Sequence, residues 1–479
     1  MASTVATLIR KTVTKGVVKL AQFNGGRLKA PAEPHPYLTG IHAPMADELT
    51  ITTLKVTGTI PAELDGRYIR IGPNPVTPPN PASYHWFTGD GMVHGVRLQG
   101  GNALWYRNRW IRSHVVSAAL CEEPAPGERN GRSDLVNTNV LGHAGEIWGF
   151  VEAGGYPVRL DGDLNTVAHD PFGGTLKGSF TAHPHLDPLT GEMHAICYDA
   201  TQHNRIRHVV VGAQGKVRRE ELISVEHGPS IHDCMITKNY VIIMDLPVTF
   251  SMKRMTQGYP FPYEWNPDHK ARVGLLPREG TNEDIIWCPV DPAYVFHPCN
   301  GYERSDGSVI LDVCAHDTMF AQSTQGPDSA RVPLERWTID PETRTVTRAV
   351  IDKESQEFPR LNEQRLGQAY RYAYTVALPD GFDATAPNQH MLYKHDLEAG
   401  TRALHDFGKG KVPSEFIFVP KAGAKAEDEG WMMGYVVDTV ADTTDLVILD
   451  AANFEAKPVA RVHIPHRIPS GFHGNWVAG

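Results

Sequence analysis

The sequence contains little cysteine, and its cysteines lack the spacing of common metal or disulfide motifs. Six cysteines are spread over 479 residues, and no two of them form a CxxC pair. We therefore expect reduced thiols, no disulfide framework and no covalently attached haem, which requires a CxxCH motif. No apolar run is long enough to span a membrane, and no secretory signal is recognisable. These absences predict a cytoplasmic protein.

An excess of basic residues is also missing, with one local exception. The 46 lysines and arginines are outnumbered by 55 aspartates and glutamates, giving a net charge of -9, which argues against a nucleic-acid partner. Residues 1–30, however, carry only basic charges, and their apolar residues recur at three- and four-residue steps. This pattern predicts a basic amphipathic helix that either makes a peripheral contact with an anionic membrane or packs on the body of the protein. We treat residues 31–479 as a single domain.

Long helical patterns are scarce, and strand patterns dominate from about residue 50 onward. Segments such as GRYIRIG, YVIIMDL, SVILDVC and LVILD are short and rich in β-branched and aromatic residues, as is typical of strands. Turns that contain aspartate recur between them, as in LDGDLNTV, LDPLTGEM, IDPETRTV, HDLEAGTR and LDAANFEA. Aspartate favours such turns because its carboxylate accepts hydrogen bonds from the backbone ahead of it.

The spacing of these turns indicates a repeat. The last three begin about 55 residues apart, and four short strands in roughly 50–60 residues is the rhythm of a β-propeller blade. The chain has room for about seven such units. Residues 22–40 and 70–86 are rich in proline and glycine and are predicted to be loops. We therefore predict an all-β, seven-bladed β-propeller in which long insertions on one face form a lid over the axis.

Four histidines stand in short apolar or small-residue contexts. They lie in TAHPHLDP, IHDCMI, FHPCNGYE and PSGFHGNW, as His183, His232, His297 and His473. Their separations of about 50, 65 and 175 residues fit no local zinc motif. In a propeller, however, the innermost strand of every blade points at one axis, so one histidine from each of four blades would meet there. Four imidazoles suit iron, copper, zinc or nickel; the alternative is four unrelated histidines among 23.

Three glutamates are candidates to support such a centre. A histidine that binds a metal usually donates its other N–H to a carboxylate or a carbonyl, and a buried carboxylate needs a partner. Glu152 in WGFVEAGG, Glu357 in SQEFPR and Glu415 in PSEFIFV each stand in an otherwise apolar stretch. Each, taken singly, fits a half-buried surface glutamate equally well.

These seven residues carry a resemblance to the carotenoid cleavage oxygenase family, which also contains stilbene cleavers and the vertebrate retinoid isomerase. The resemblance runs from GTIPAELDGRYIRIGPNP through WFTGDGMVHG to RIPSGFHGNW, and all seven residues stand in the family's motifs and order. It implies a seven-bladed propeller with a dome of loops and short helices over an axial metal site. It further implies one Fe(II) per chain, held by the four histidines, with the three glutamates hydrogen-bonded to its ligands.

The resemblance also implies the chemistry. Members use Fe(II) and O2, with neither haem nor nicotinamide, to cleave a conjugated C=C bond of a carotenoid or apocarotenoid into aldehyde or ketone products. The principal alternative within the family is cleavage of a stilbene or phenylpropanoid double bond, as in isoeugenol or a vinylphenol. An ester-cleaving isomerase with the same centre and a propeller that only binds a partner are the remaining alternatives.

Four residues are expected to line the substrate pocket: Val151, Tyr106, Phe296 and Phe358. The phenol-cleaving relatives pair a tyrosine with a lysine that stands immediately before the first of the glutamates. Tyr106 in WYRNRW matches the tyrosine, but Val151 occupies the position of the lysine. Because this pair is incomplete, we expect an apolar polyene as substrate in preference to an aryl alkene.

Overall fold

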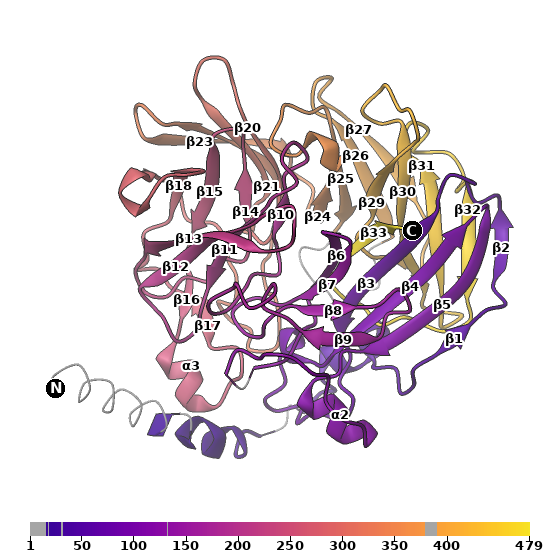
Figure 1. Ribbon diagram of the computed structural model, residues 1–479. Coiled ribbons are helices and arrows are strands. Elements are labelled where there is room, and N and C mark those ends of the chain that lie inside the picture. Colours follow the sequence, from indigo (N-terminus) through magenta and orange to yellow (C-terminus); the bar gives the residue numbers. More distant parts are fainter. Residues whose placement is uncertain (1–15, 18, 30–31, 132, 379–389) are drawn as a thin grey trace.

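The computed structural model describes residues 16–17, 19–29, 32–131, 133–378 and 390–479. Seven antiparallel sheets surround one axis, so the predicted seven-bladed β-propeller is confirmed (Figure 1). We number the blades 1 to 7 in the order of the chain and give their strands from the axis outward.

The first three blades contain the following strands. Blade 1 contains β33 (Gly474–Ala478), β3 (Gly66–Pro73), β4 (Gly91–Gln99), β5 (Asn102–Trp110) and β1 (Thr50–Ile51). Blade 2 contains β6 (Asn139–His143), β7 (Glu146–Phe150), β8 (Val158–Leu160) and β9 (Thr166–His169). Blade 3 contains β10 (His185–Leu186), β11 (Met193–Tyr198), β12 (Arg205–Val211) and β13 (Val217–Ser224).

The remaining blades follow the same plan. Blade 4 contains β14 (Cys234–Ile236), β15 (Tyr240–Asp245), β18 (Arg272–Pro277) and β19 (Ile286–Pro289). Blade 5 contains β20 (Pro298–Glu303), β21 (Val309–Cys314), β22 (Leu334–Asp340) and β23 (Thr345–Asp352). Blade 6 contains β24 (Gln356–Arg360), β25 (Tyr372–Ala377), β26 (Met391–Asp396) and β27 (Thr401–Asp406). Blade 7 contains β28 (Lys411–Pro413), β29 (Ile417–Pro420), β30 (Gly430–Asp438), β31 (Thr443–Asp450), β32 (Ala460–Ile464) and β2 (Lys55–Gly58).

The aspartate turns between strands form as the sequence predicts. In each of the five, the carboxylate accepts a hydrogen bond from the backbone N–H two residues later, at 2.8 to 3.2 Å. The aspartates are Asp161, Asp187, Asp340, Asp396 and Asp450. The aspartate of each turn therefore satisfies a backbone N–H of the same turn, and this fixes where one strand ends and the next begins.

The two ends of the chain close the ring together. β33, near the C-terminus, pairs with β3 and is the innermost strand of blade 1. β2, near the N-terminus, pairs with β32 and is the outermost strand of blade 7. Blades 1 and 7 also pack against each other, with the rings of Tyr68 and Tyr435 in an edge-to-face contact 4.8 Å apart. Closure leaves neither blade with an incomplete sheet.

Short helices and loops gather on one side of the propeller, at the bottom of Figure 1. They include α2 (His114–Leu120), α3 (Met252–Gln257) and the hairpin of β16 (Val248–Phe250) and β17 (Tyr263–Trp265). The 3₁₀ helices are η1 (Pro36–Leu38), η2 (Gly40–His42), η3 (Trp86–Thr88), η4 (Asn282–Asp284) and η5 (Glu363–Arg365). We call the side that carries α2 and α3 the dome.

The N-terminal segment is described only in part, because residues 1–15, 18 and 30 lie outside the described residues. Residues 19–25 are helical, so the loop predicted from residue 22 begins later than expected. This helix lies against α3: the Asn24 side-chain amide donates to the carbonyl of Thr256 at 2.7 Å, and Gly25 contacts Gly258 directly.

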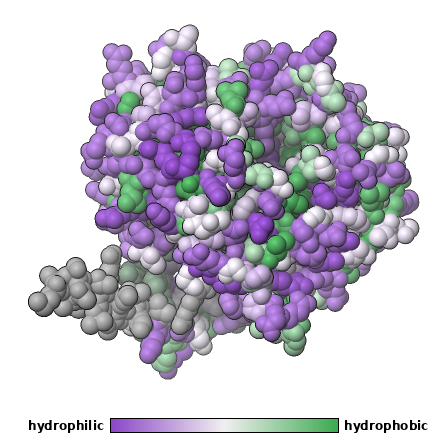
Figure 2. Space-filling view, in the orientation of Figure 1, coloured by the Kyte–Doolittle hydropathy of each residue, from purple (hydrophilic) through white to green (hydrophobic). Residues whose placement is uncertain are grey.

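The outer surface is largely hydrophilic, with hydrophobic groups scattered among polar ones in the view of Figure 2. No helix among the described residues is long and apolar enough to cross a membrane.

Replacing Gly474 by alanine tests the closure. A Cβ at this position would lie 2.9 Å from the carbonyl oxygen of Ile69 in β3, so β33 would have to shift. We expect a loss of about 1–3 kcal/mol of stability and a melting temperature lower by a few degrees, measured by thermal unfolding. Gly212→Ala is the control, because its Cβ would meet its nearest neighbour at an ordinary 3.6 Å. Equal stability of the two variants would contradict the prediction.

Candidate metal centre and adjoining cavity

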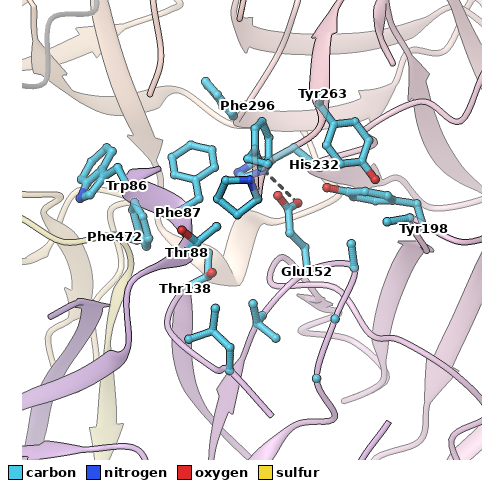
Figure 3. A pocket seen from close by; sticks show the side chains of 18 of the residues that line it. Trp86, Phe87, Thr88, Thr138, Glu152, Tyr198, His232, Tyr263, Phe296 and Phe472 are labelled. Atoms are coloured by element: carbon cyan, nitrogen blue, oxygen red, sulfur yellow. Dashed lines mark ion pairs between the residues drawn. The ribbon is translucent and has the colours of Figure 1, made fainter. Parts of the chain in front are cut away.

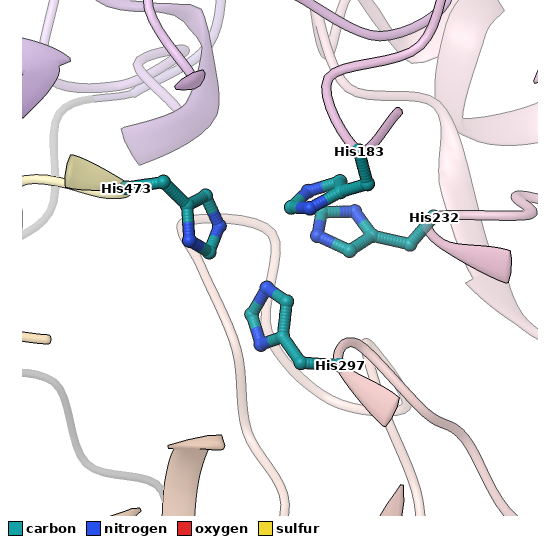
Figure 4. Close-up of side chains that lie close together, drawn as sticks. All are labelled: His183, His232, His297 and His473. Atoms are coloured by element: carbon teal, nitrogen blue, oxygen red, sulfur yellow. The ribbon is translucent and has the colours of Figure 1, made fainter. Parts of the chain in front are cut away.

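The four histidines identified in the sequence meet on the propeller axis (Figure 4). Each stands one or two residues before the innermost strand of a different blade: β10, β14, β20 or β33. The side chains of His183, His232, His297 and His473 are all buried, and one ligand-type nitrogen from each lies within 4.8 Å of the others. Blade geometry thus joins residues that are remote in the sequence.

The four rings are close enough to share one ion. The ring of His183 lies 4.3 Å from that of His232 and 4.6 Å from that of His473, centroid to centroid. His297 lies 4.7 Å from His473 and 5.2 Å from His232. No described residue forms a hydrogen bond with Nε2 of His183 or Nε2 of His297. Because a buried nitrogen without a partner is costly, these orphaned atoms fit a metal ion between the rings.

Three of the histidines contact a glutamate through Nδ1. Glu357 Oε2 lies 2.7 Å from His297 Nδ1, and Glu415 Oε1 lies 3.0 Å from His473 Nδ1. Glu152 Oε2 lies 3.0 Å from His232 Nδ1. These contacts leave Nε2 of each ring to face the centre, which is the arrangement that orients a metal ligand.

His183 differs from the other three histidines. The carboxylate that pairs with it is not a glutamate but Asp233, whose Oδ2 lies 3.8 Å from His183 Nδ1. Asp233 Oδ1 is already bonded to His185 Nε2 at 2.7 Å. The sequence does not tell which of the four histidines lacks a glutamate partner, and the structure shows that it is His183.

The three glutamates differ in burial and in the hydrogen bonds that hold them. Glu357 is fully buried, and its second oxygen lies 2.8 Å from Nε2 of the buried His316. Glu415 accepts from the backbone N–H of Gly474 at 2.9 Å and from the Arg360 guanidinium at 3.3 Å. Glu152 is partly exposed, and no described residue forms a well-aligned hydrogen bond with its Oε2.

The backbone turns sharply immediately after two of these glutamates. Ala153, after Glu152, has a φ of 56°, and Phe358, after Glu357, has a φ of 52°. Residues other than glycine seldom adopt this left-handed conformation. In β24 the strand pairing also shifts between Glu357 and Arg360, as at a bulge that redirects a side chain. The strained backbone thereby turns Glu357 toward His297, while Phe358 lines the cavity described below.

Every blade contributes one residue to this assembly. Blades 3, 4, 5 and 1 supply the histidines in chain order, and blades 2, 6 and 7 supply Glu152, Glu357 and Glu415. The site therefore depends on the complete ring.

Burial and charge set the protonation of the group. Burial, followed by the proximity of the other three histidines, holds the pKa of His183 well below its ordinary value. Burial also lowers the pKa of His473, although Glu415 opposes this. Burial alone would raise the pKa of Glu415, but the charges of His473 and Arg360 outweigh it and hold that pKa at about 2. At His297 burial alone would lower the pKa, but the charge of Glu357 outweighs burial and raises that pKa. A metal ion binds only the neutral form of each imidazole, which keeps its lone pair.

An apolar cavity of about 200 Å³ opens from the centre on the dome side (Figure 3). Three of the four predicted pocket residues, Val151, Phe296 and Phe358, line it, together with His232, His297 and His473. Much of the remaining wall is aromatic and includes Trp86, Phe87, Phe261 and Phe472.

Tyr106, the fourth predicted pocket residue, lies elsewhere, and that prediction is corrected. It belongs to β5, the fourth strand from the axis, so its side chain points into the contact between blades 1 and 7. There it is fully buried near Tyr68 and Tyr435, and its hydroxyl lies 3.0 Å from Nδ1 of His94.

Two other tyrosines line the cavity instead and were not found from the sequence. The rings of Tyr198 and Tyr263 lie 5.8 Å apart in an edge-to-face contact, and Figure 3 shows both beside Glu152. Tyr198 ends β11 and Tyr263 begins β17, and neither position carries a local sequence signal. Trp86 and Phe87 could have been found, because they open the WFTGDG stretch that carries part of the resemblance.

Comparison with known proteins agrees with this geometry. The family model described as RPE65, retinal pigment epithelial membrane protein, matches residues 42–478. A carotenoid cleavage oxygenase from Mycobacterium tuberculosis is 42% identical, over 94% of this chain and 98% of its own length. The chain belongs to the carotenoid cleavage oxygenase family. It is therefore an enzyme of the carotenoid cleavage oxygenase type.

Solved structures of this family share the fold over nearly the whole chain. The cobalt-substituted apocarotenoid oxygenase (ACO) of Synechocystis superposes with a TM-score of 0.82 at 27% identity, covering 94% of this chain and all of that one. The lignostilbene dioxygenase of Pseudomonas brassicacearum gives a TM-score of 0.83 at 25% identity, with the same coverage. The family thus includes a carotenoid-type and a stilbene-type neighbour of nearly equal structural similarity.

The unequal support of the glutamates leads to a prediction. Glu357→Gln replaces one of the two acceptor oxygens that contact His297 and His316 with an NH2 donor in a fully buried position, so we expect a 10- to 100-fold loss of Co(II) affinity. Glu152→Gln alters a single contact at a partly exposed carboxylate and should cost less than tenfold. Competition with a chelator measures both constants. An equal or larger loss for Glu152→Gln would contradict the ranking.

Proposed function

We propose that the protein is a non-haem Fe(II) dioxygenase that cleaves a conjugated C=C bond of a carotenoid or apocarotenoid. The observation that carries the proposal is the cluster of four buried histidines at the end of an apolar cavity, in which no described residue hydrogen-bonds to Nε2 of His183 or of His297. Residues 31–479 act as one catalytic domain, because all seven blades supply a residue to the centre.

The donor set suits Fe(II). Four neutral nitrogen donors bind first-row divalent metals well, and His183, His232, His297 and His473 would hold the ion. Because no fifth protein donor joins these four in the described residues, a bound ion would remain accessible to small molecules. When bound, Fe(II) supplies the activation of O2 for addition across the double bond. Both oxygen atoms end in the two carbonyl products, so the reaction balances without an added reductant.

The protein's own residues position the reactants. The carboxylates of Glu152, Glu357 and Glu415 fix the ring orientation of three ligands and offset the charge of the ion. The aromatic wall holds an elongated olefin next to the centre and excludes water, and such orientation is a large part of catalysis. No side chain has to act as a general acid, base or nucleophile in this scheme.

The lining favours a polyene. Val151, directly before Glu152, places an apolar side chain where the phenol-cleaving relatives have a lysine. Tyr106, which was expected to match the tyrosine that pairs with this lysine, lies outside the cavity. The Mycobacterium tuberculosis relative and the Synechocystis neighbour are both named for carotenoid or apocarotenoid cleavage.

A stilbene or phenylpropanoid substrate is the second candidate, and one observation favours it. Tyr198 and Tyr263 line the cavity, and the hydroxyl of Tyr198 accepts a hydrogen bond from Ser230 Oγ at 3.1 Å. The proton of the Tyr198 hydroxyl therefore remains for a phenolic or carbonyl oxygen of a ligand.

Turnover under ¹⁸O2 tests the proposal. Fe(II)-loaded protein is incubated with β-carotene, several apocarotenals, resveratrol and isoeugenol, and the products are identified by mass. We expect aldehydes or ketones from the polyenes, with one labelled oxygen in each fragment when back-exchange is controlled. Turnover confined to resveratrol and isoeugenol would replace the first candidate by the second.

The control variant for this assay is His232→Ala. It removes one of the four ligands while leaving the apolar wall in place, so both bound iron and turnover should fall to background. Full activity in iron-free His232→Ala protein would refute the metal mechanism.

We further propose a peripheral membrane contact on the dome side. Leu20, Phe23 and Met252 are large apolar side chains that are 47%, 56% and 51% exposed. Arg27 lies over the ring of Phe23, 3.9 Å from its centroid. Exposed apolar groups next to basic residues fit the interface of an anionic bilayer. The chain that follows α3 lines the apolar cavity through Phe261, so a substrate dissolved in the bilayer would have a short path inward.

Sedimentation with anionic vesicles tests this contact. Phe23→Glu should weaken binding at least fivefold, because it places a negative charge at the lipid surface. Leu189→Glu is the matched control: Leu189 is 74% exposed in the β10–β11 turn, away from the dome. Equal binding of the wild type and Phe23→Glu, or an equal loss in Leu189→Glu, would refute the proposed surface.

A further inference from the structure

A second cavity adjoins the four histidines on the side away from the dome. It measures about 210 Å³, and His183, His297 and His473 line its inner end. Phe296 and Phe472, directly before two of the ligands, face the apolar cavity, whereas residues after those ligands face the second one. The innermost strands therefore carry the chain from one cavity, past the centre, into the other.

The wall of the second cavity is more polar than that of the first. Its lining contains three carboxylates, those of Asp233, Glu363 and Glu415, and one guanidinium, that of Arg360. Arg360 is itself held by Glu415 at 3.3 Å and by Glu363. The net charge of these groups is negative, which favours a cation. We call this space the polar cavity.

Asp233 links the polar cavity to the centre. Its Oδ1 lies 2.7 Å from Nε2 of His185, and its Oδ2 lies 3.8 Å from Nδ1 of His183. The backbone N–H of Cys234 also donates to Oδ1, at 2.6 Å. The carboxylate thus spans an outer histidine and the one ligand histidine that has no glutamate.

His185 and Asp233 are a donor pair suited to a divalent cation. An imidazole and a carboxylate are both common ligands of first-row metals, and their donor atoms lie within 4.8 Å of the thiol of Cys234. Cys234 is only 1% exposed and packs in the apolar core, so the pair consists of His185 and Asp233. His185 is 16% exposed and lines the polar cavity.

The two cavities are unequal as routes for a metal ion. A divalent ion arrives with bound water, and stripping that water in an apolar space is costly. The polar cavity offers replacement donors at each step, first the His185–Asp233 pair and then His183. The apolar cavity offers mainly aromatic rings, and substrate would fill it.

We propose that His185 and Asp233 form an entry site through which a divalent metal ion passes from the polar cavity to the four-histidine centre. The proposal rests on the proposed function only in that the four histidines bind a metal ion. An entry site lies on the path and is not part of the final ligand set. It therefore speeds uptake and release of the ion by the same factor and leaves the affinity unchanged.

Uptake of Co(II) by metal-free, full-length protein tests the proposal. The visible absorption of bound Co(II) follows uptake, and chelator competition follows release and gives the dissociation constant. In His185→Gln we expect both rates to fall at least tenfold, with the dissociation constant within about threefold of wild type. Asp233→Asn should slow uptake at least tenfold as well, and it should also weaken affinity because Asp233 contacts the ligand His183. Tyr263→Phe, which removes a hydroxyl from the apolar cavity, should leave both rates unchanged.

A second experiment blocks the apolar cavity with a substrate. Metal-free protein is first saturated with an apocarotenal under anaerobic conditions and then given Co(II). Uptake at the unliganded rate supports entry through the polar cavity, and uptake that stops overturns it.

The remaining outcomes are equally decisive. Unchanged uptake in both variants overturns the proposal, as does faster release with a weakened affinity in His185→Gln, which would make His185 and Asp233 residues that only position His183. If Asp233→Asn does not fold, His185→Gln decides alone, because it changes only the outer, partly exposed donor. Failure of the wild type to bind Co(II) refutes the four-histidine centre itself and so separates the two proposals.

Discussion

The pairing of β33 with β3 is the constraint on which the rest of the structure depends. It supplies blade 1 with its innermost strand and, in the same step, carries His473 to the axis. The backbone N–H of Gly474 then donates to Glu415 of blade 7, so the ring is joined at the level of the centre as well as at its rim. Closure and site formation are therefore one event. A propeller left open at this seam would lose its fourth histidine together with its sheet pairing.

The electrostatics of the centre follow from burying four imidazoles in one place. Protonation of all four would be prohibitive at this spacing, and burial lowers the pKa values of His183 and His473. The glutamate carboxylates contact Nδ1, on the side of each ring away from the centre, so they orient the ring without occupying the position of the ion. The glutamates are not held equally well: Glu357 is hydrogen-bonded to two histidines, whereas Glu152 is partly exposed and has a single contact. The four corners of the centre are thus chemically alike but not equivalent.

Much of this could be predicted from the sequence because propeller geometry is periodic. The aspartate turns marked the blades, and the spacing of the histidines matched whole numbers of blades. Tyr106 was misplaced because a motif match does not report how far a strand lies from the axis. Tyr198 and Tyr263 stand in no recognisable motif and were missed. They reach the cavity from the end of β11 and from the dome hairpin, and only the three-dimensional path of the chain brings them together. The Asp233 contact was likewise invisible, since nothing local distinguishes its two oxygens.

The order in which the blades are made has a consequence for synthesis. Three of the four histidines are present once the chain reaches His297, but His473 follows about 175 residues later. At about 5–20 residues per second, roughly 10–35 s of translation separate the third ligand from the fourth. During that interval a nascent chain would expose a three-histidine half-site open to whichever metal is at hand. The complete set of four histidine donors therefore exists only after β33 has paired with β3.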